Sequence, residues 1–179
     1  MNFIKSYISG CIMIEAEISK DNRGTFIKNF NSNTFLKNNI DENFSESYFS
    51  YSHKNVLRGM HFQKTPNQIS KLIFCSKGKV MDVFLDIRPD SETFGKFDSV
   101  ILSDENGKHI YLSEGIAHGF LVLSENATVH YLQSGVYDQE SDSGILWNSF
   151  GMNWPIDNPI LSKRDKGFIT FAEYKNSNR

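Results

Sequence analysis

The chain has 179 residues, the length of one domain, and 39% of them are hydrophobic, including 15 phenylalanines, so a core can form without disulfide bonds. Its 19 basic and 21 acidic residues give a formal net charge of −2, which argues against a general nucleic-acid or membrane surface. We therefore predict a single domain over residues 1–179, in which any anion is bound by a local cluster.

The N-terminal residues 1–17 lack the continuous apolar core and the cleavage site of a signal peptide. No apolar run approaches the roughly 20 residues that a membrane span needs, so we expect a cytoplasmic protein. Cys11 and Cys75 lie among apolar residues without CxxC spacing, and we read them as small buried hydrophobes.

Short strands separated by turns follow one another along the chain. Residues 11–30 predict a strand pair, and residues 33–39 carry one of the few helical patterns. Three further hairpins are predicted at the turns 76–78, 104–107 and 124–126. Turn signals recur without long helices between them, which favours an antiparallel sandwich or barrel. The last five residues, KNSNR, look disordered.

Residues 79–88 show the clearest alternation in the chain. Met81, Val83, Leu85 and Ile87 share one face of the predicted strand, and residues 80, 82, 84, 86 and 88 share the other.

The histidines divide into two groups. We expect His53 and His109, which sit beside lysines at strand ends, to face water, and we read His130 as structural. His61 and His118 lie deep in strand-like segments. A single histidine in a strand is more often a satisfied core residue than a catalyst, so neither position alone establishes chemistry.

A metal site is the first alternative for the cluster Arg58, His61, Gln63 and Lys71. Small β-barrels often bind a metal through two histidines separated by one residue and a following carboxylate. Here Gln63 stands where the second histidine would be, and Lys71 opposes a cation. We therefore predict that this cluster does not bind a metal.

The remaining interpretation is an anion-binding pocket in which His61 acts as a general base. Such a base needs an orienting partner and, across the substrate, an acid. The candidates are Asp82, Asp86, Asp165, Tyr131 and Tyr137, and their spacing in the sequence does not choose among them.

Nine motifs spread over nearly the whole chain carry a family resemblance. They are DNRGTF (21–26), NVLRGMHFQ (55–63), SKL (70–72), GKVMDVFLDIRPDSETFGKF (78–97), LSEGIAHGF (112–120), HYLQSGVY (130–137), GILWN (144–148), NWP (153–155) and LSKRD (161–165). In this order and spacing the sequence resembles the dTDP-4-dehydrorhamnose 3,5-epimerases.

The resemblance implies a fold and an activity. The fold is an all-β cupin jelly roll, an antiparallel double-sheet barrel, with short helices in the N-terminal third and at the C-terminus. The activity is that of a metal-free isomerase. It epimerises C3, C5 or both in a 4-keto-6-deoxy sugar linked to a nucleotide diphosphate, within deoxysugar biosynthesis for surface polysaccharide, and it consumes no cofactor.

The resemblance also implies residue roles. His61 would be the base, Asp165 its partner, Tyr131 the acid and Lys71 the cation that stabilises the enolate. The implied substrate-binding residues are Arg23, Phe26, Lys28, Glu46, Arg58, Gln63, His118 and Tyr137. In the family, N-terminal strands cross to a partner subunit, so we expect a homodimer in which Arg23 serves the site of the other chain.

The chain departs from the family pattern at two places that contact the nucleobase. Lys28 stands where an acidic residue is frequent, and Glu46-Ser47-Tyr48 replaces a frequent Gln-Asp-Asn. A carboxylate and a lysine would suit guanine, so a GDP-linked substrate stays open beside a dTDP-linked one.

Rival functions also stay open. They are epimerisation at only C3 or only C5, a nucleotide-sugar 3,4-ketoisomerase, and a sugar-binding cupin without catalysis.

Overall fold

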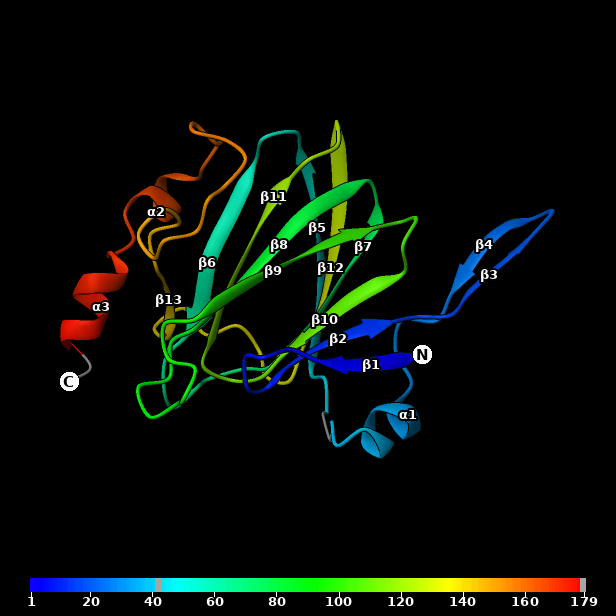
Figure 1. The fold of residues 1–179 in the computed structure, drawn as a ribbon, viewed down its shortest axis with the longest axis horizontal. Coiled ribbons are helices and arrows are strands. Elements are labelled where there is room, and N and C mark those ends of the chain that lie inside the picture. The colour runs from blue at the N-terminus through cyan, green and yellow to red at the C-terminus, as the bar shows by residue number, and fades with distance from the viewer. Residues whose placement is uncertain (41–42, 178–179) are drawn as a thin grey trace.

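Two antiparallel sheets form the body of the protein in the computed structural model, which describes residues 1–40 and 43–177 (Figure 1). The first sheet has six strands in the order β1 (Asn2–Lys5), β2 (Cys11–Glu15), β10 (Lys108–Leu112), β7 (Lys71–Lys77), β12 (Asn126–Gln133) and β5 (Glu46–His53). The second has five strands in the order β13 (Asp142–Gly144), β6 (Leu57–Gln63), β11 (Ile116–Val122), β8 (Lys79–Asp86) and β9 (Phe97–Ser103). The predicted all-β cupin jelly roll is thereby confirmed.

The alternation predicted for residues 79–88 is found in β8. Met81, Val83, Leu85 and Ile87 pack in a hydrophobic cluster on the outer side of the five-stranded sheet, where Phe150 and Phe171 cover them. Val80 and Phe84 point the other way, into the cluster between the two sheets. Because β8 is buried on both faces, its two remaining inward positions, Asp82 and Asp86, lie in the interior.

The three predicted hairpins at 76–78, 104–107 and 124–126 are wrong as strand pairs. The turns exist, but β7 and β8, β9 and β10, and β11 and β12 each belong to different sheets. Turn residues reverse the chain, whereas the partner of a strand is decided by which faces must be buried. These turns therefore carry the chain from one layer of the barrel to the other.

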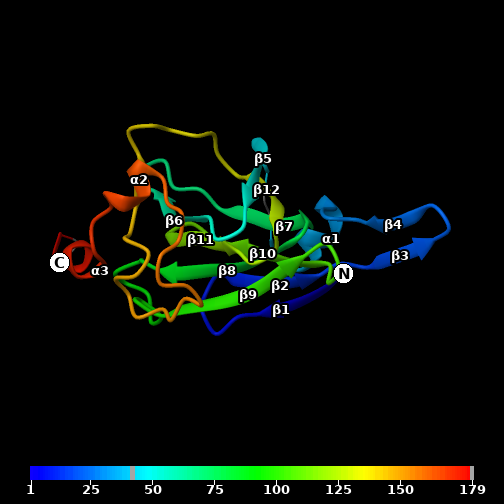
Figure 2. The ribbon, with the colours of Figure 1, turned by 90° about the horizontal axis from the view of Figure 1, so that it is seen from above.

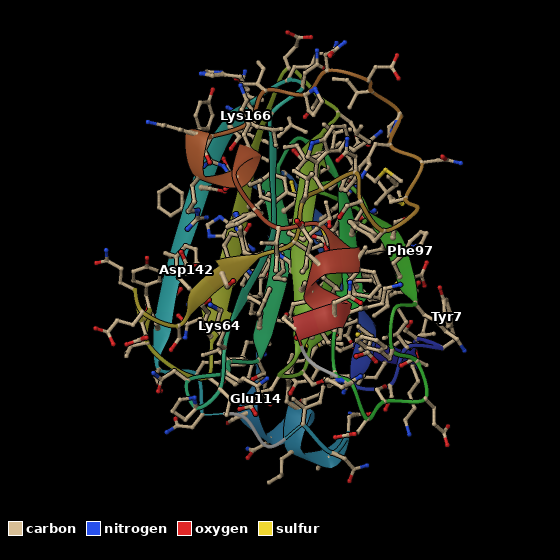
Figure 3. The ribbon with its side chains drawn as sticks, turned by 90° about the vertical axis from the view of Figure 1, so that its left-hand side faces the viewer. Tyr7, Lys64, Phe97, Glu114, Asp142 and Lys166 are labelled. Atoms are coloured by element: carbon tan, nitrogen blue, oxygen red, sulfur yellow. The ribbon has the colours of Figure 1, made fainter. Side chains whose placement is uncertain are left out.

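The helices are short and lie at the predicted ends of the chain. α1 (Ser32–Lys37) begins at Asn31, whose side-chain oxygen accepts a hydrogen bond from the Thr34 N–H at 3.0 Å. α2 (Lys163–Lys166) and α3 (Phe171–Ser177) follow the last strand, and α3 lies over the outside of the five-stranded sheet (Figure 3).

The end of α3 corrects the prediction of a disordered tail, because residues 175–177 are helical; residues 178–179 lie outside the described part. No helix in residues 1–40 or 43–177 is long and apolar enough to cross a membrane.

One hairpin stands apart from the barrel. β3 (Ile18–Asp21) and β4 (Gly24–Ile27) pair with each other and project away from both sheets (Figures 1 and 2). The hairpin carries Arg23 and Phe26, and Lys28 follows it directly. The side chain of Phe26 is 66% exposed, which is unusual for a large apolar ring.

His109 corrects the expectation of a water-facing side chain. It is buried, contacts the Gly107 carbonyl and the Asn29 side-chain oxygen at 3.0 Å each, and stacks on Phe74. Burial lowers the pKa of His109 to about 4, so it is a neutral core residue.

Both cysteines are free and buried, as predicted.

Candidate active site

His61 on β6 faces the interior of the barrel and is held by Asp165 of α2. Its Nε2 atom lies 3.0 Å from Asp165 Oδ1. Asp165 is itself fixed by two hydrogen bonds. Its carboxylate Oδ2 accepts one from the Gly59 N–H at 3.2 Å, and its backbone N–H donates one to Ser162 Oγ at 3.0 Å. This arrangement gives the imidazole one orientation relative to the cavity.

Gly59 is required by close backbone packing at this point. Its φ of +141° lies in the region that favours glycine, and a Cβ atom there would lie 2.5 Å from Gly119 Cα on β11. A larger residue would push β6 away from β11 and move both His61 and Asp165.

The ionisation of this pair suits a general base. Burial lowers the pKa of His61, while the hydrogen bond and the charge of Asp165 act in the opposite direction, and the net shift is downward. Burial raises the pKa of Asp165, but the contacts with His61 and Gly59 outweigh it and hold that pKa well below its usual range. At neutral pH the pair is therefore an aspartate beside a neutral imidazole.

Lys71 on β7 places a buried cation in the same cavity. Within the described residues it makes no ion pair inside 4 Å, and its side chain is nearly inaccessible to water. Burial lowers the pKa of Lys71 to about 8, although Asp142 and Asp82 favour the charged form. Lys71 is thus mostly charged at neutral pH and is available to an anion that enters the cavity.

Tyr131 on β12 reaches the cavity from the six-stranded sheet, opposite His61 on the five-stranded sheet. It is buried, and its ring contacts His118 edge to face, with centroids 5.9 Å apart. Burial raises the pKa of Tyr131 well above its usual value, and the neighbouring Tyr48 and Asp82 act in the same direction. The phenol is therefore protonated at neutral pH, as a proton donor must be.

Two further predicted residues have fixed partners. His118 Nε2 lies 2.8 Å from Asp82 Oδ2 in the interior, and Arg58 Nε donates to Ser52 Oγ at 3.0 Å. Asp82 thus pairs with His118 rather than with His61. Asp86 bonds to neither histidine. It accepts hydrogen bonds from Arg88, Ser91 and Thr93 instead. Of the carboxylates left open by the sequence, Asp165 is the one bonded to His61.

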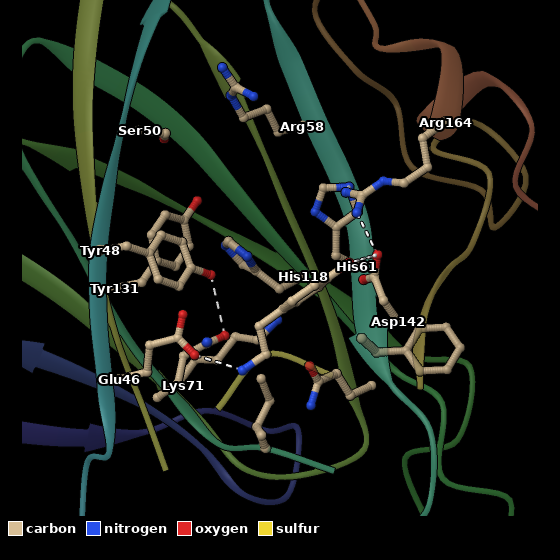
Figure 4. Close-up of a pocket in the computed structure, with 15 residues that line it drawn as sticks. Glu46, Tyr48, Ser50, Arg58, His61, Lys71, His118, Tyr131, Asp142 and Arg164 are labelled. Carbon is tan, nitrogen blue, oxygen red and sulfur yellow. Dashed lines mark hydrogen bonds and ion pairs between the residues drawn. The ribbon is translucent and has the colours of Figure 1, made fainter. Parts of the chain in front are cut away.

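These groups line one cavity of about 340 Å³ (Figure 4). Its lining residues are Glu46, Tyr48, Ser50, Arg58, His61, Phe62, Gln63, Ile69, Lys71, His118, Tyr131, Gln133, Tyr137, Asp142 and Arg164. Eight predicted site residues are in this set, and Asp165 lies directly behind His61. The volume is within the range of small-molecule sites.

Gln63 and Glu46 make contacts that the sequence did not predict. Gln63 Nε2 donates to the Asn67 carbonyl at 2.7 Å and its Oε1 accepts from the Asp138 N–H at 2.8 Å, so the amide also supports the loop beside the cavity. Glu46 accepts a hydrogen bond from the Tyr137 N–H at 2.6 Å.

Three predicted residues are not brought to the cavity of their own chain. Arg23, Phe26 and Lys28 are on or next to the projecting hairpin, outside the lining set. The side chain of Arg23 is 86% exposed and is bonded to Asp21 of the same turn.

Arg164 and Asp142 are site residues that the sequence analysis missed. Arg164 Nη1 donates to Asp142 Oδ2 at 2.5 Å, and its Nη2 lies 2.8 Å from His61 Nε2. A neutral imidazole nitrogen carries either a proton or a lone pair, so Nε2 serves Asp165 or Arg164 but not both at once. The position of Arg164, directly before Asp165, was the available signal for it.

A protein-family model described as dTDP-4-dehydrorhamnose 3,5-epimerase matches residues 5–173. The dTDP-4-dehydrorhamnose 3,5-epimerase of Methanothermobacter thermautotrophicus is 40% identical over 176 residues, covering 96% of this chain and 95% of that protein. A dTDP-4-dehydrorhamnose 3-epimerase of Streptomyces niveus is 34% identical and covers 95% and 84%. The solved structure of an epimerase from Mycobacterium tuberculosis is similar with a TM-score of 0.94 at 34% identity, covering 99% of this chain and 92% of that one.

Proposed function

Because this chain belongs to the dTDP-4-dehydrorhamnose 3,5-epimerase family, we propose that it inverts C3, C5 or both in a dTDP-linked 4-keto-6-deoxy sugar. The observation that carries the proposal is the placement of base and acid. His61 enters the cavity from the five-stranded sheet and Tyr131 from the six-stranded sheet, so a sugar between them has one on each side. Deuterium incorporation from D₂O at the inverted carbon tests it.

The base works through Nδ1 of His61. When Nε2 carries the proton and donates it to Asp165, the lone pair is on Nδ1. The ketone at C4 acidifies the hydrogens on C3 and C5, and Nδ1 removes one of them. Asp165 stabilises the imidazolium that forms, as an anion 3.0 Å from Nε2 must.

The negative charge that develops on O4 meets Lys71. This ammonium has no ion-pair partner within 4 Å among the described residues, and Asp142 and Asp82 act on it only from farther away, so no direct counterion occupies it before the substrate arrives. Because Lys71 is only 7% exposed, a cation placed there in advance is worth more than one in solution. Return of a proton by Tyr131 to the opposite face of the enolate then inverts the carbon.

The rate should follow a bell-shaped pH profile. We expect kcat/KM to fall on the acid side as His61 becomes protonated, at a pH below the ordinary titration range of histidine because burial lowers the pKa of His61, and to fall again near pH 8, as Lys71 loses its proton. Tyr131 does not cause the alkaline limb, since its pKa is raised well above 10.

The variant Lys71→Arg tests whether Lys71 is the group that causes the alkaline limb. A guanidinium stays charged, so the alkaline limb should move beyond the measured range while the maximal rate falls. An unchanged alkaline limb in Lys71→Arg would show that a different group titrates there.

We also infer that the active unit is a homodimer with exchanged N-terminal hairpins. The hairpin projects from the barrel with an exposed Phe26, and Arg23 lies outside the cavity of its own chain. A partner that receives the hairpin would bury Phe26 and gain Arg23 as an anion ligand.

A mixing experiment tests this assembly. Arg23→Ala and His61→Asn, each poorly active alone, should recover about a quarter of wild-type activity when co-expressed, since half the dimers would be mixed and each would hold one intact site. If Arg23 serves its own chain, no mixed dimer has an intact site and the activity stays low. A fully active monomer in sedimentation at micromolar concentration would also refute the exchange.

For the nucleobase we propose thymine. The guanine alternative requires Glu46 to face the base, but Glu46 already accepts a hydrogen bond from the Tyr137 N–H. The curated relatives are named for dTDP-linked sugars.

Calorimetric titration should give at least about tenfold tighter binding of dTDP than of GDP, the effect of one unsatisfied hydrogen bond. Tighter binding of GDP would reverse the assignment.

A further inference from the structure

Tyr48 lies directly against the proposed acid and has no role in the mechanism above. It faces Tyr131 in the register of β5 and β12, and the two rings stack with centroids 4.8 Å apart and an angle of 17° between their planes (Figure 4). Glu46, Tyr48 and Ser50 alternate along β5, and all three line the cavity. Tyr48 is therefore part of the wall that surrounds the reacting groups.

The ring of Tyr48 is itself anchored. Its hydroxyl donates a hydrogen bond to Gln133 Oε1 at 3.2 Å, and Gln133 is only 3% exposed. A buried acceptor of this kind restricts the ring to one orientation, although Tyr48 as a whole is 41% exposed on an edge strand. The stack on Tyr131 is thus supported from both the ring face and the hydroxyl.

Tyr131 is held from two sides. Tyr48 covers its ring face to face, and His118 meets it edge to face at 74°, with Asp82 fixing His118 from behind. Stacked and edge-to-face pairs are both favourable aromatic geometries. Because transfer of a proton depends on distance and alignment, a clamp on the ring acts directly on the donor.

We propose that Tyr48 is a positioning residue that holds Tyr131 in the orientation from which it returns the proton to the enolate. The inference rests on the proposed function, and it concerns only the second half of the reaction. His61 forms the enolate from the other wall of the cavity, and within the described residues it has no hydrogen bond or ring contact with Tyr48. Proximity to Tyr48 also disfavours the charged form of Tyr131, in keeping with a phenol that must be protonated before it acts.

Three variants separate the stack from the hydrogen bond and from general effects on the strand. Tyr48→Ala removes the stack, Tyr48→Phe keeps the ring and removes the bond to Gln133, and Tyr51→Ala removes a half-exposed ring of the same strand that does not line the cavity. The measured quantity is the ratio of inversion to deuterium exchange at the reacting carbon, with a 4-keto-6-deoxy sugar linked to dTDP as substrate.

We expect Tyr48→Ala to lower this ratio about tenfold, the factor that an aromatic pair can supply, with proton removal little changed. Tyr48→Phe and Tyr51→Ala should keep the wild-type ratio. A wild-type ratio in Tyr48→Ala would overturn the proposal, because a merely structural role lowers exchange and inversion together. An equal loss in Tyr48→Phe would also overturn it, because the stacked ring would then not be what holds Tyr131.

A second readout does not depend on turnover. In ring-labelled protein, nuclear magnetic resonance should show faster flipping of the Tyr131 ring in Tyr48→Ala than in wild type or Tyr51→Ala. An unchanged flip rate would contradict the clamp. Absence of exchange by the wild-type protein would count against the proposed function, while the ring measurement would still decide the role of Tyr48.

Discussion

His61→Asn lowers turnover by at least about 10²-fold in our account, the usual contribution of a general base. Asparagine has no basic nitrogen, so the enolate cannot form at a useful rate. The side chain is close in size and keeps an N–H for Asp165, so the contact between β6 and α2 should survive. The measurement is deuterium incorporation into substrate, which reports proton removal alone.

The matched control for this variant is His53→Asn. His53 is exposed on β5 and contacts Asn126, outside the cavity. The His53→Asn variant should incorporate deuterium into the substrate at the wild-type rate. If His61→Asn also washed in deuterium at nearly the wild-type rate, His61 would not be the base.

Tyr131→Phe should separate the two halves of the reaction. The ring and its stack on Tyr48 remain, but the proton donor is lost. His61 still forms the enolate and returns the proton to the same face, so we expect exchange with retention at the reacting carbon. Inversion should fall about 10²-fold relative to exchange, as expected for the loss of a general acid.

Tyr137→Phe is the comparison for this second prediction. Tyr137 lines the same cavity, and its hydroxyl lies 3.4 Å from Asp142 Oδ2. Tyr137→Phe should keep inversion coupled to exchange. If it lost inversion while Tyr131→Phe kept it, Tyr137 would be the acid.

Local patterns in the sequence predicted what is local in the structure. The alternation over residues 79–88 places each side chain on one face of β8, because successive strand residues point to opposite sides. The turn residues marked reversals of the chain correctly. They did not identify strand partners, since pairing in a two-layer barrel depends on faces that are far apart in sequence.

The same limit applies to the active site. The motif resemblance gathered His61, Lys71, His118 and Tyr131, and the structure places all four on one cavity. Asp142 was not predicted, because β13 has only three residues and therefore shows no alternation of polar and apolar side chains. His109 was misjudged because its neighbour in sequence, Lys108, says nothing of Asn29 and Phe74, which enclose it.

Arg164 shows how little side-chain direction follows from sequence. It lies beside the predicted Asp165, yet its guanidinium reaches Asp142 on one side and His61 on the other. That arrangement depends on where α2 is placed against β6, a tertiary contact that no local pattern encodes.

The central claim is that a base and an acid on opposite walls invert a carbon next to a ketone. The most direct test is to incubate the wild-type protein with a dTDP-linked 4-keto-6-deoxy hexose in D₂O and to locate deuterium and configuration by nuclear magnetic resonance. We predict deuterium at C3, C5 or both, with inversion at each labelled carbon and the carbonyl still at C4. Movement of the carbonyl to C3 with deuterium at C4 would identify a ketoisomerase, and no deuterium at any carbon would identify a binding protein; either result would contradict the account.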